Sequence, residues 1–407
     1  MRPLVVYAQP AMLAREASTG MSPPNPIGED LISHWLLDPA IRFLNHGCFG
    51  ATPKVVLEAQ TALRTRIESR PVEVLDRGRG PLLQEAKQAV GGLIGAAPED
   101  LGFVTNATGG VNAVMRSLSL GPADEVVTTN HAYNAIRQTL RFVSEHDGPK
   151  VVEARIDLPI RSPRAAVEAV AAAVGPRTRL VVIDHITSPT AVLLPIARII
   201  ELCAERGVDV LVDGAHAPGM IELDVPSLNT AYYTGNLHKW VCAPKGAAFL
   251  WVRPDRQKQI HPNTISHFLN QGLAEEFSWQ GTRDITAWLC TKEAIEFMAR
   301  FGWERVRRHN HELATWAQSR LCSLWEVEPA TPLDGSMLGS MATVPLPEAA
   351  KDLGPIEEVQ ARLYRDHRIE VPVIEFEVRR WIRVSCQIYN TADQYQRLGE
   401  AVLEMIP

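Results

Sequence analysis

The chain of 407 residues lacks a long apolar run, a cluster of basic residues and a dense set of cysteines. Without about 20 consecutive apolar residues, no segment is suited to crossing a membrane. The net charge of -6 leaves no positive surplus for a phosphate backbone, so we expect no nucleic-acid partner. The six cysteines show neither the paired spacing of a zinc site nor the density of a disulfide framework. This scarcity favours reduced thiols in the cytoplasm and predicts no metal site.

The N-terminus also lacks the uninterrupted apolar core of a signal peptide, because Pro3 and Pro10 break it. We expect residues 1–42 to form an N-terminal extension and arm, or to begin with a start codon upstream of the true one at Met12 or Met21.

The whole chain contains 46% hydrophobic and 22% charged residues. That is the composition of an ordinary folded protein, and the length fits one large and one smaller domain.

The pattern of apolar residues predicts an α/β protein. Helical spacing recurs over residues 55–69 and 81–95, where apolar side chains return every three or four positions. From about Leu101, short apolar β-rich runs alternate with helical ones, which indicates a mainly parallel sheet sandwiched by helices. The last part mixes helices and strands as a small α+β domain does. We predict a large domain over residues 43–295 and a smaller C-terminal α+β domain over residues 296–407.

Two polar residues follow predicted strands, at the edge of a parallel sheet where ligands bind. Asp213 ends the run DVLVDGAH, although a carboxylate there also serves as a turn residue or helix cap. Lys239 lies between two apolar strands in YYTGNLHKWVCAPKGAAFL. Burial of a lysine is costly, and a desolvated lysine is the nucleophile that Schiff-base chemistry needs. Taken alone, however, such a lysine is more often a solvated surface residue.

A third feature is the run FVTNATGGVNAV, in which a strand meets a helix of small residues. Free N–H groups and the helix dipole at such a terminus bind phosphate, although many strand–helix turns look similar. A phosphate site, a strand-end aspartate and a buried lysine, in this order, suit pyridoxal phosphate (PLP). Its ring nitrogen requires an acidic partner and its aldehyde requires a lysine.

Six longer segments strengthen this interpretation: FLNHGCFGATP, TNATGGVNAV, VDGAHAPGM, YTGNLHKWVCAPKGAAFL, WQGTRD and RWIRVSCQIYN. Together they resemble the class V, fold-type I PLP enzymes, and specifically the branch of isopenicillin N epimerase and related C–S lyases. The likeness runs from about Phe43 to Asn390. It implies the fold-type I architecture, a small amino acid as substrate and a homodimer with shared active sites.

The resemblance also implies a role for individual residues. Lys239 would hold the cofactor as a Schiff base and move the Cα proton, and Asp213 would keep the ring nitrogen protonated. His216 would lie near the ring hydroxyl or Asp213. The other implied cofactor contacts are Asn106, Ala107, Thr108 and His238 at the phosphate, Thr282 reaching the phosphate from a neighbouring subunit, and Ser188 at the ring oxygen.

Two rings compete for the place over the cofactor, because the resemblance puts either His131 or Tyr133 there. Family members often have an acidic residue before that tyrosine, where this chain has Ala132. This departure leaves open which ring stacks and whether the type member's reaction is kept. Arg383 would hold the substrate carboxylate with its planar guanidinium, and Asn45 would lie near the substrate. The alternatives are a helix-capping role for His131 and a surface ion pair for Arg383.

Several reactions at Cα share these residues. A persulfide-forming desulfurase needs a cysteine on the loop before the substrate-binding arginine, and PATPLDGSMLGSMATVPLP has none. Epimerisation needs a second acid or base opposite Lys239, for which His131 or Tyr133 would serve. Elimination needs only Lys239 and a leaving sulfur, with Tyr133 able to protonate it.

We therefore predict a PLP-dependent lyase that performs β-elimination on a cysteine S-conjugate in a biosynthetic pathway. Epimerisation of the isopenicillin N epimerase type is the first alternative, and transamination or decarboxylating deamination is the second. A non-catalytic binding protein with the same fold is disfavoured, because Lys239 and Asp213 are both present.

Overall fold

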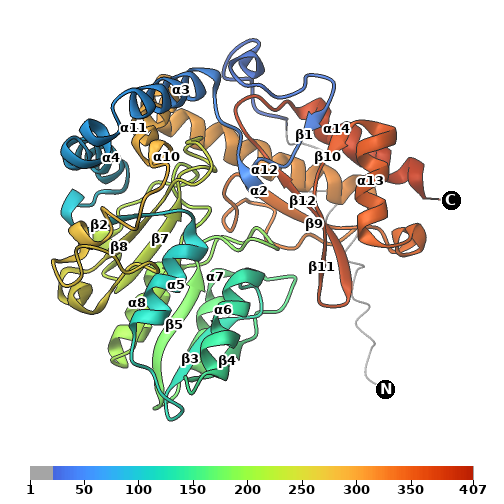
Figure 1. Cartoon of the computed structure of the whole chain (residues 1–407). Helices are drawn as coiled ribbons and strands as arrows, with labels where there is room; N and C mark the ends of the chain where they lie inside the picture. Colours follow the sequence, from blue (N-terminus) through green and yellow to red (C-terminus); the bar gives the residue numbers. More distant parts are fainter. Residues whose placement is uncertain (1–21, 407) are drawn as a thin grey trace.

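The computed structural model describes residues 22–406, which fold around a large and a small sheet (Figure 1). The alternative starts at Met12 and Met21, and the first half of the predicted extension, lie outside the described residues. The strands of the large sheet are β2 (Leu101–Val104), β3 (Glu125–Thr129), β4 (Lys150–Ala154), β5 (Thr178–Asp184), β6 (Asp209–Asp213), β7 (Tyr232–Asn236) and β8 (Ala248–Val252).

The large sheet has the strand order β2-β8-β7-β6-β5-β3-β4. Only β8 runs antiparallel to its neighbours, and every other pair is parallel. Parallel strands need crossover connections, which explains why apolar strand-like runs alternate with helical ones in the sequence. The mainly parallel α/β architecture predicted from that alternation is confirmed.

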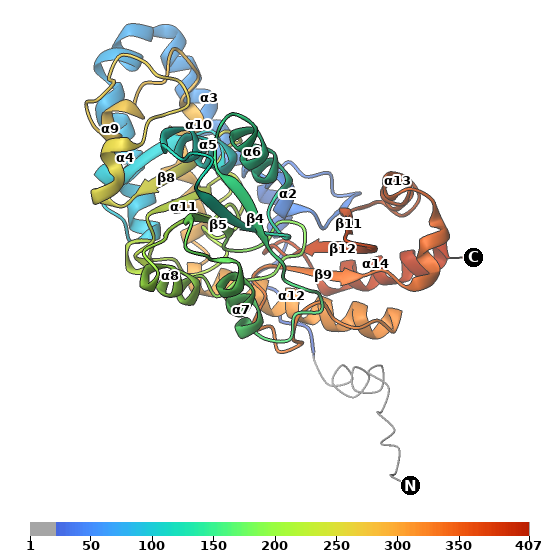
Figure 2. The ribbon, with the colours of Figure 1, turned by 90° about the horizontal axis from the view of Figure 1, so that it is seen from below.

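Helices cover both faces of this sheet. Figure 2 shows α5 and α6 on one side of the strands and α7 and α8 on the other. Helices α3, α4, α10 and α11 pack against one another, α9 packs against β2, and α2 lies towards the small sheet (Figure 1). The bounds are α2 (His46–Phe49), α3 (Lys54–Ser69), α4 (Arg79–Ile94), α5 (Ala107–Ser117), α6 (Asn134–Glu145), α7 (Pro163–Ala173), α8 (Ile196–Glu205), α9 (Leu273–Glu276), α10 (Thr286–Leu289) and α11 (Thr291–Ala299). Helices α3 and α4 are the two that the apolar spacing predicts.

The small sheet is antiparallel, with the order β11-β12-β9. Its strands are β9 (Met341–Pro345), β11 (Val373–Phe376) and β12 (Arg379–Ser385), and the helices around it are α12 (Trp303–Trp325), α13 (Ile356–His367) and α14 (Ala392–Met405). Two short parallel strands, β1 (Arg42–Phe43) and β10 (Ile369–Glu370), join the N-terminal segment to this part.

Helix α12 connects the two hydrophobic cores. Val306 near its start belongs to the core of the large sheet, whereas Leu313 and the buried residues after it belong to the core of the small sheet. Leu44 also packs in the small-sheet core, because β1 holds its segment there. The proposed boundary between residues 295 and 296 stays a prediction. Within residues 22–406, no helix is long and apolar enough to span a membrane.

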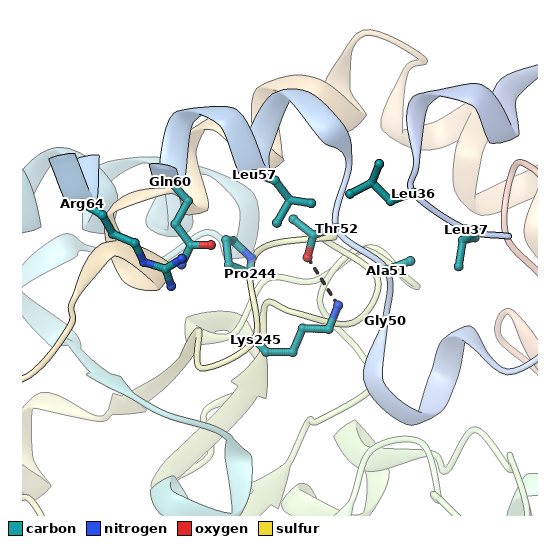
Figure 3. A pocket seen from close by; sticks show the side chains of 10 residues that line it. All are labelled: Leu36, Leu37, Gly50, Ala51, Thr52, Leu57, Gln60, Arg64, Pro244 and Lys245. Atoms are coloured by element: carbon teal, nitrogen blue, oxygen red, sulfur yellow. Dashed lines mark hydrogen bonds between the residues drawn. The ribbon is translucent and has the colours of Figure 1, made fainter. Parts of the chain in front are cut away.

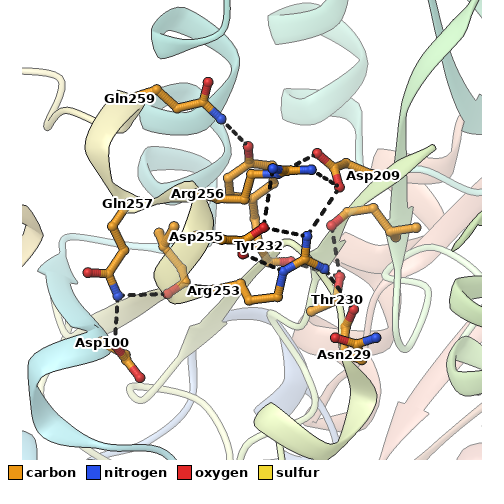
Figure 4. Close-up of polar contacts among 12 residues, drawn as sticks. Asp100, Asp209, Asn229, Thr230, Tyr232, Arg253, Asp255, Arg256, Gln257 and Gln259 are labelled. Carbon is orange, nitrogen blue, oxygen red and sulfur yellow. Dashed lines mark hydrogen bonds and ion pairs between the residues drawn. The ribbon is translucent and has the colours of Figure 1, made fainter. Parts of the chain in front are cut away.

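An ion-pair network closes the N-terminal edge of the large sheet (Figure 4). Asp209, the first residue of β6, accepts two bonds from Arg256, Nε to Oδ2 at 2.8 Å and Nη2 to Oδ1 at 3.2 Å. Arg253 also pairs with Asp209, Nη2 to Oδ1 at 3.6 Å. Because β6 runs from Asp209 to Asp213, this network lies at the opposite end of the strand from Asp213.

We expect Asp209→Ala to lower the free energy of unfolding by about 1–2 kcal/mol, between the values for exposed and buried ion pairs. Arg253 and Arg256 would both lose their shared partner. The side chain of Asp209 is only 28% exposed, so water shields these ion pairs only partly. The measurement is the midpoint of chemical denaturation, with Asp255→Ala as the matched control at a side chain that is 53% exposed. An equal shift of the midpoint in the two variants would contradict the larger contribution to stability predicted for Asp209.

Candidate active site

A cavity of about 590 Å³ lies between the large sheet and the small sheet. Its walls come from residues after β3, β5 and β7 on one side and from α2, β11 and β12 on the other. Four predicted site residues that are far apart in the sequence, Tyr133, Ser188, Lys239 and Arg383, all line it. The carboxyl ends of the parallel strands thus open into this cavity, as in other open α/β sheets.

Lys239 is buried beside the ring of His216. Its Nζ lies 3.0 Å from Nε2 of His216, and the indole Nε1 of Trp240 donates to Nδ1 of the same ring at 3.4 Å. An indole N–H can only donate, so Nδ1 is the acceptor and Nε2 carries the proton of the neutral ring. That proton can be donated to the Lys239 amine whenever the amine is neutral.

The electrostatics agree with this arrangement. Burial, together with the charge of Arg383, lowers the pKa of Lys239 to about 8. Burial and the charge of Lys239 hold the pKa of His216 well below its usual value, so the ring stays neutral. A lysine with a pKa of about 8 has a much larger neutral, nucleophilic fraction at physiological pH than an ordinary lysine has.

Two carboxylates, Asp213 and Asp184, end neighbouring strands directly beside each other. Both are buried, and the carboxylate of Asp213 accepts the N–H of Ala215 at 3.0 Å. Burial raises the pKa of both groups, and the negative charge of Asp213 raises the pKa of Asp184 further. Like charges this close and this buried do not both ionise. We place the negative charge on Asp213, where the Ala215 N–H and Lys239 stabilise it.

The N-terminus of α5 presents backbone N–H groups in the region predicted to hold a phosphate. Asn106 is its N-cap, and its side-chain oxygen accepts the N–H of Gly109 at 2.8 Å. The side-chain oxygen of Asn236 accepts the N–H of Ala107 at the same distance. Thr108 lies half-buried between these two amides. Oxygen acceptors therefore already occupy donors of the kind that an anion uses at a helix terminus.

The two candidate stacking rings differ in their surroundings. His131 is fully buried, with Nε2 2.8 Å from the Ile156 carbonyl oxygen and Nδ1 2.6 Å from Oγ1 of Thr190. Burial lowers its pKa to about 4. Tyr133 is 45% exposed and lines the cavity, where His131 does not. Because Tyr133 lines the cavity and His131 does not, we assign the stacking role to Tyr133 as a prediction.

Arg383, on β12, reaches into the cavity from the small sheet. Its Nη1 donates to the carbonyl oxygen of Ser188 and, at 3.3 Å, to the Ser188 hydroxyl. Its Nη2 donates to Sγ of Cys48 at 2.9 Å. The side chain is only 3% exposed, and its Nε has no hydrogen-bond partner. An arginine held this way offers donors to a carboxylate in the cavity.

The remaining predicted residues lie outside the lining of this cavity. Asn45 is buried and donates to Oε1 of Glu370 at 3.1 Å. His238 donates from Nδ1 to the Ala247 carbonyl oxygen at 3.1 Å, and burial lowers its pKa to about 4. Thr282 is exposed. Within residues 22–406, no group of three or more His, Cys, Asp or Glu side chains is placed to hold a metal ion.

The sequence reasoning missed two residues of the site. Asp184 ends β5 as Asp213 ends β6, so the rule that selected Asp213 also selects Asp184. Its carboxylate also accepts the backbone N–H of Tyr133. Cys48 gave no comparable signal, because only the three-dimensional fold brings α2 against β12.

A close backbone approach fixes the position of α2. Gly50, which follows it, has a φ of +66°, and a Cβ there would lie 1.9 Å from the carbonyl oxygen of His238. Residues 50–52 continue into a second cavity of about 380 Å³, in which Lys245 donates to Oγ1 of Thr52 at 3.5 Å (Figure 3). Only glycine allows this contact, so Cys48 is held against the segment that carries Lys239.

Residues 50–398 match the family model described as Aminotransferase class-V. The chain belongs to the class V aminotransferase family. It is 36% identical to isopenicillin N epimerase of Amycolatopsis lactamdurans, an alignment that covers 91% of this chain and 96% of that protein. It is 32% identical to the putative L-cysteine desulfhydrase 1 of Oryza sativa subsp. japonica, with coverage of 89% and 83%. The resemblance to this branch is therefore confirmed.

Solved structures agree on the fold. A cysteine desulfurase from Thermococcus onnurineus NA1 matches with a TM-score of 0.78 at 20% identity, covering 95% of this chain and 99% of that one. The cystine C–S lyase C-DES, in complex with cysteine persulfide, matches with a TM-score of 0.76 at 21% identity, covering 90% and 98%. These matches confirm the fold-type I architecture.

The family is PLP-dependent, so this class V member is a PLP-dependent enzyme. Its own residues fit that cofactor. Lys239 supplies a buried amine with a lowered pKa for the aldehyde, and the Asp213 carboxylate suits the ring nitrogen. The predicted cofactor is thus confirmed, and the individual contacts remain predictions.

Proposed function

We propose that the enzyme is a C–S lyase, which removes a β-sulfur substituent from a cysteine S-conjugate. The observation that carries this proposal is the shared cavity of Lys239 and Arg383, an amine with a lowered pKa opposite a buried guanidinium. Lys239 would hold the cofactor and transfer the Cα proton, and Arg383 suits an α-carboxylate. The similarity to L-cysteine desulfhydrases supports the same reaction class.

Each of these residues has a separate proposed role in the reaction. When bound, PLP supplies an electron-accepting ring that stabilises negative charge at Cα. Lys239 would bind the cofactor covalently and remove the Cα proton, while Asp213 would keep the ring nitrogen protonated. Arg383 binds the substrate carboxylate with its planar guanidinium. Tyr133, whose ring lines the cavity, protonates the leaving sulfur.

The lining of the cavity favours a conjugate over free cysteine. The cavity, with its volume of about 590 Å³, is shared between the cofactor on Lys239 and the substrate, so the lining decides which side chain is favoured. Beyond Arg383, its walls include the aromatic rings of Phe49, Tyr133 and Phe376, with Asn130 and Asn134 beside them. We therefore propose that the sulfur carries an apolar or aromatic substituent.

Epimerisation at Cα is the second candidate, because the chain is 36% identical to an isopenicillin N epimerase. That reaction needs an acid or base on the face opposite Lys239. Tyr133 is the candidate, since both ring nitrogens of His131 are engaged by Thr190 and Ile156.

One assay separates these reactions. The purified holoenzyme is incubated with S-benzyl-L-cysteine, L-cysteine or isopenicillin N, and pyruvate, ammonia and exchange of the Cα proton with D₂O are measured together. We expect pyruvate and ammonia in equal amounts from S-benzylcysteine, faster than from cysteine. Exchange and inversion without pyruvate would establish the epimerase instead. Absence of release and exchange with all three amino acids would overturn both candidates.

The lowered pKa of Lys239 predicts how the apoenzyme takes up its cofactor. Only the neutral amine attacks an aldehyde, and the neutral fraction rises with pH up to a pKa of about 8 and is complete above it. We expect the uptake rate, followed by absorbance, to rise about tenfold per pH unit below 8 and to level off above it. A rate that keeps rising towards pH 10 would show that Lys239 titrates like an ordinary lysine.

We further propose a homodimer in which Thr282 of each subunit reaches the partner's phosphate site. The exposed Thr282 and the apolar side chains of Phe49 and Leu36, 73% and 70% exposed beside the two cavities, support this assembly.

Six cysteines without a disulfide support the proposed location in the cytoplasm. A biosynthetic role follows the similarity to isopenicillin N epimerase.

A further inference from the structure

The carboxylate site of the cavity contains a thiol. Cys48, on α2, lines the same wall as Arg383 and accepts a hydrogen bond from its Nη2, N to Sγ at 2.9 Å. All six cysteines lie within the described residues, and Cys48 alone is not buried. Cys48 is therefore the thiol that a reagent entering this cavity reaches.

The guanidinium of Arg383 beside this thiol has an N–H group without a hydrogen-bond acceptor. Arg383 is 97% buried, yet its Nε has no hydrogen-bond partner, and its Nη2 has only the weak sulfur acceptor of Cys48. A buried charged donor without a full acceptor is costly, and a carboxylate is the acceptor that suits its fork. The arrangement is therefore complete only with an anionic ligand next to Cys48.

We propose that Cys48 is a positioning residue of the carboxylate site, whose sulfur occupies one donor of Arg383 until a carboxylate ligand takes that donor. The inference rests on the proposed function only in naming a carboxylate as the ligand of Arg383. It has a chemical consequence that does not depend on turnover. A small carboxylate bearing an electrophilic carbon next to its carboxyl group is delivered to the sulfur by Arg383.

Iodoacetate is the probe of this site, and iodoacetamide is its uncharged counterpart. In the reaction the sulfur attacks the methylene carbon, an S–C bond forms, the C–I bond breaks, iodide leaves and the thiol proton passes to solvent. We expect iodoacetate to alkylate Cys48 of the holoenzyme about tenfold faster, relative to iodoacetamide, than it alkylates a free thiol. Mass spectrometry of the peptide that contains Cys48 measures both rates, and Cys48→Ser identifies the labelled residue.

Two comparisons test the role of Arg383. Acetate should slow labelling by iodoacetate but not by iodoacetamide, relative to chloride at the same ionic strength. Arg383→Gln should remove the preference for iodoacetate, and Arg383→Lys should retain part of it, because the charge remains without the fork. Equal relative rates at Cys48 and at a free thiol, or a preference that survives in Arg383→Gln, would overturn the proposal. Because labelling is read by mass, this outcome is independent of whether elimination is found.

Discussion

Lys239→Ala should abolish both the visible absorbance of the lysine–cofactor bond and the release of pyruvate. The rate of elimination should fall about 10³-fold or more, because one residue supplies both the covalent attachment and the proton transfer. The structure gives the reason for the size of this effect. The amine of Lys239 is buried, has a pKa lowered to about 8 and lies 3.0 Å from His216, and no other lysine lines the cavity among the described residues.

A matched control is available six residues along the chain. Lys245 also has a pKa lowered by burial, but it donates to Thr52 in the second cavity and does not line the first (Figure 3). Lys245→Ala should therefore keep the absorbance and most of the activity. If Lys239→Ala retained its absorbance, or if Lys245→Ala lost it, the assignment of the cofactor lysine would be wrong.

Much of the fold follows from the sequence because it depends on local periodicity. The apolar spacing that predicts helices over residues 55–69 and 81–95 corresponds to α3 and α4, and the strand–helix alternation corresponds to the parallel sheet. The path of the N-terminal segment does not follow in this way. Its strand β1 pairs with β10, more than 300 residues away, and no local pattern specifies such a pairing.

The site was predictable to the extent that its residues end strands. Asp213 and Lys239 stand where a buried strand stops, and the same rule applies to Asp184, which was overlooked. The difference between His131 and Tyr133 depends on tertiary contacts, because the Ile156 carbonyl that engages His131 comes from another part of the chain. The contact of Cys48 with Arg383 joins residues 335 positions apart and is visible only in the folded protein.

Asp213→Asn should lower kcat for elimination by about 10²–10³-fold, the effect of removing one preorganised charge from a catalytic site. Asp213 is the ionised member of the buried pair, stabilised by the Ala215 N–H and by Lys239. An amide keeps the shape of the side chain but carries no negative charge, so it cannot hold a proton on the ring nitrogen. The substrate KM should change much less, because the proposed site of the α-carboxylate is Arg383, on β12 of the small sheet, whereas Asp213 ends β6 of the large sheet.

Asp184→Asn provides the matched comparison within the same pair of strand ends. Burial and the charge of Asp213 raise the pKa of Asp184 well above its usual value, so the native group is already neutral. Its amide counterpart can still accept the backbone N–H of Tyr133, and kcat should fall less than about tenfold. A greater loss in Asp184→Asn than in Asp213→Asn would place the negative charge on Asp184 and reverse their roles. The measurement is kcat and KM for both variants and the wild type from pH 6 to 9. Because Asp184 is already neutral in the wild type, Asp184→Asn should leave the shape of the pH profile unchanged.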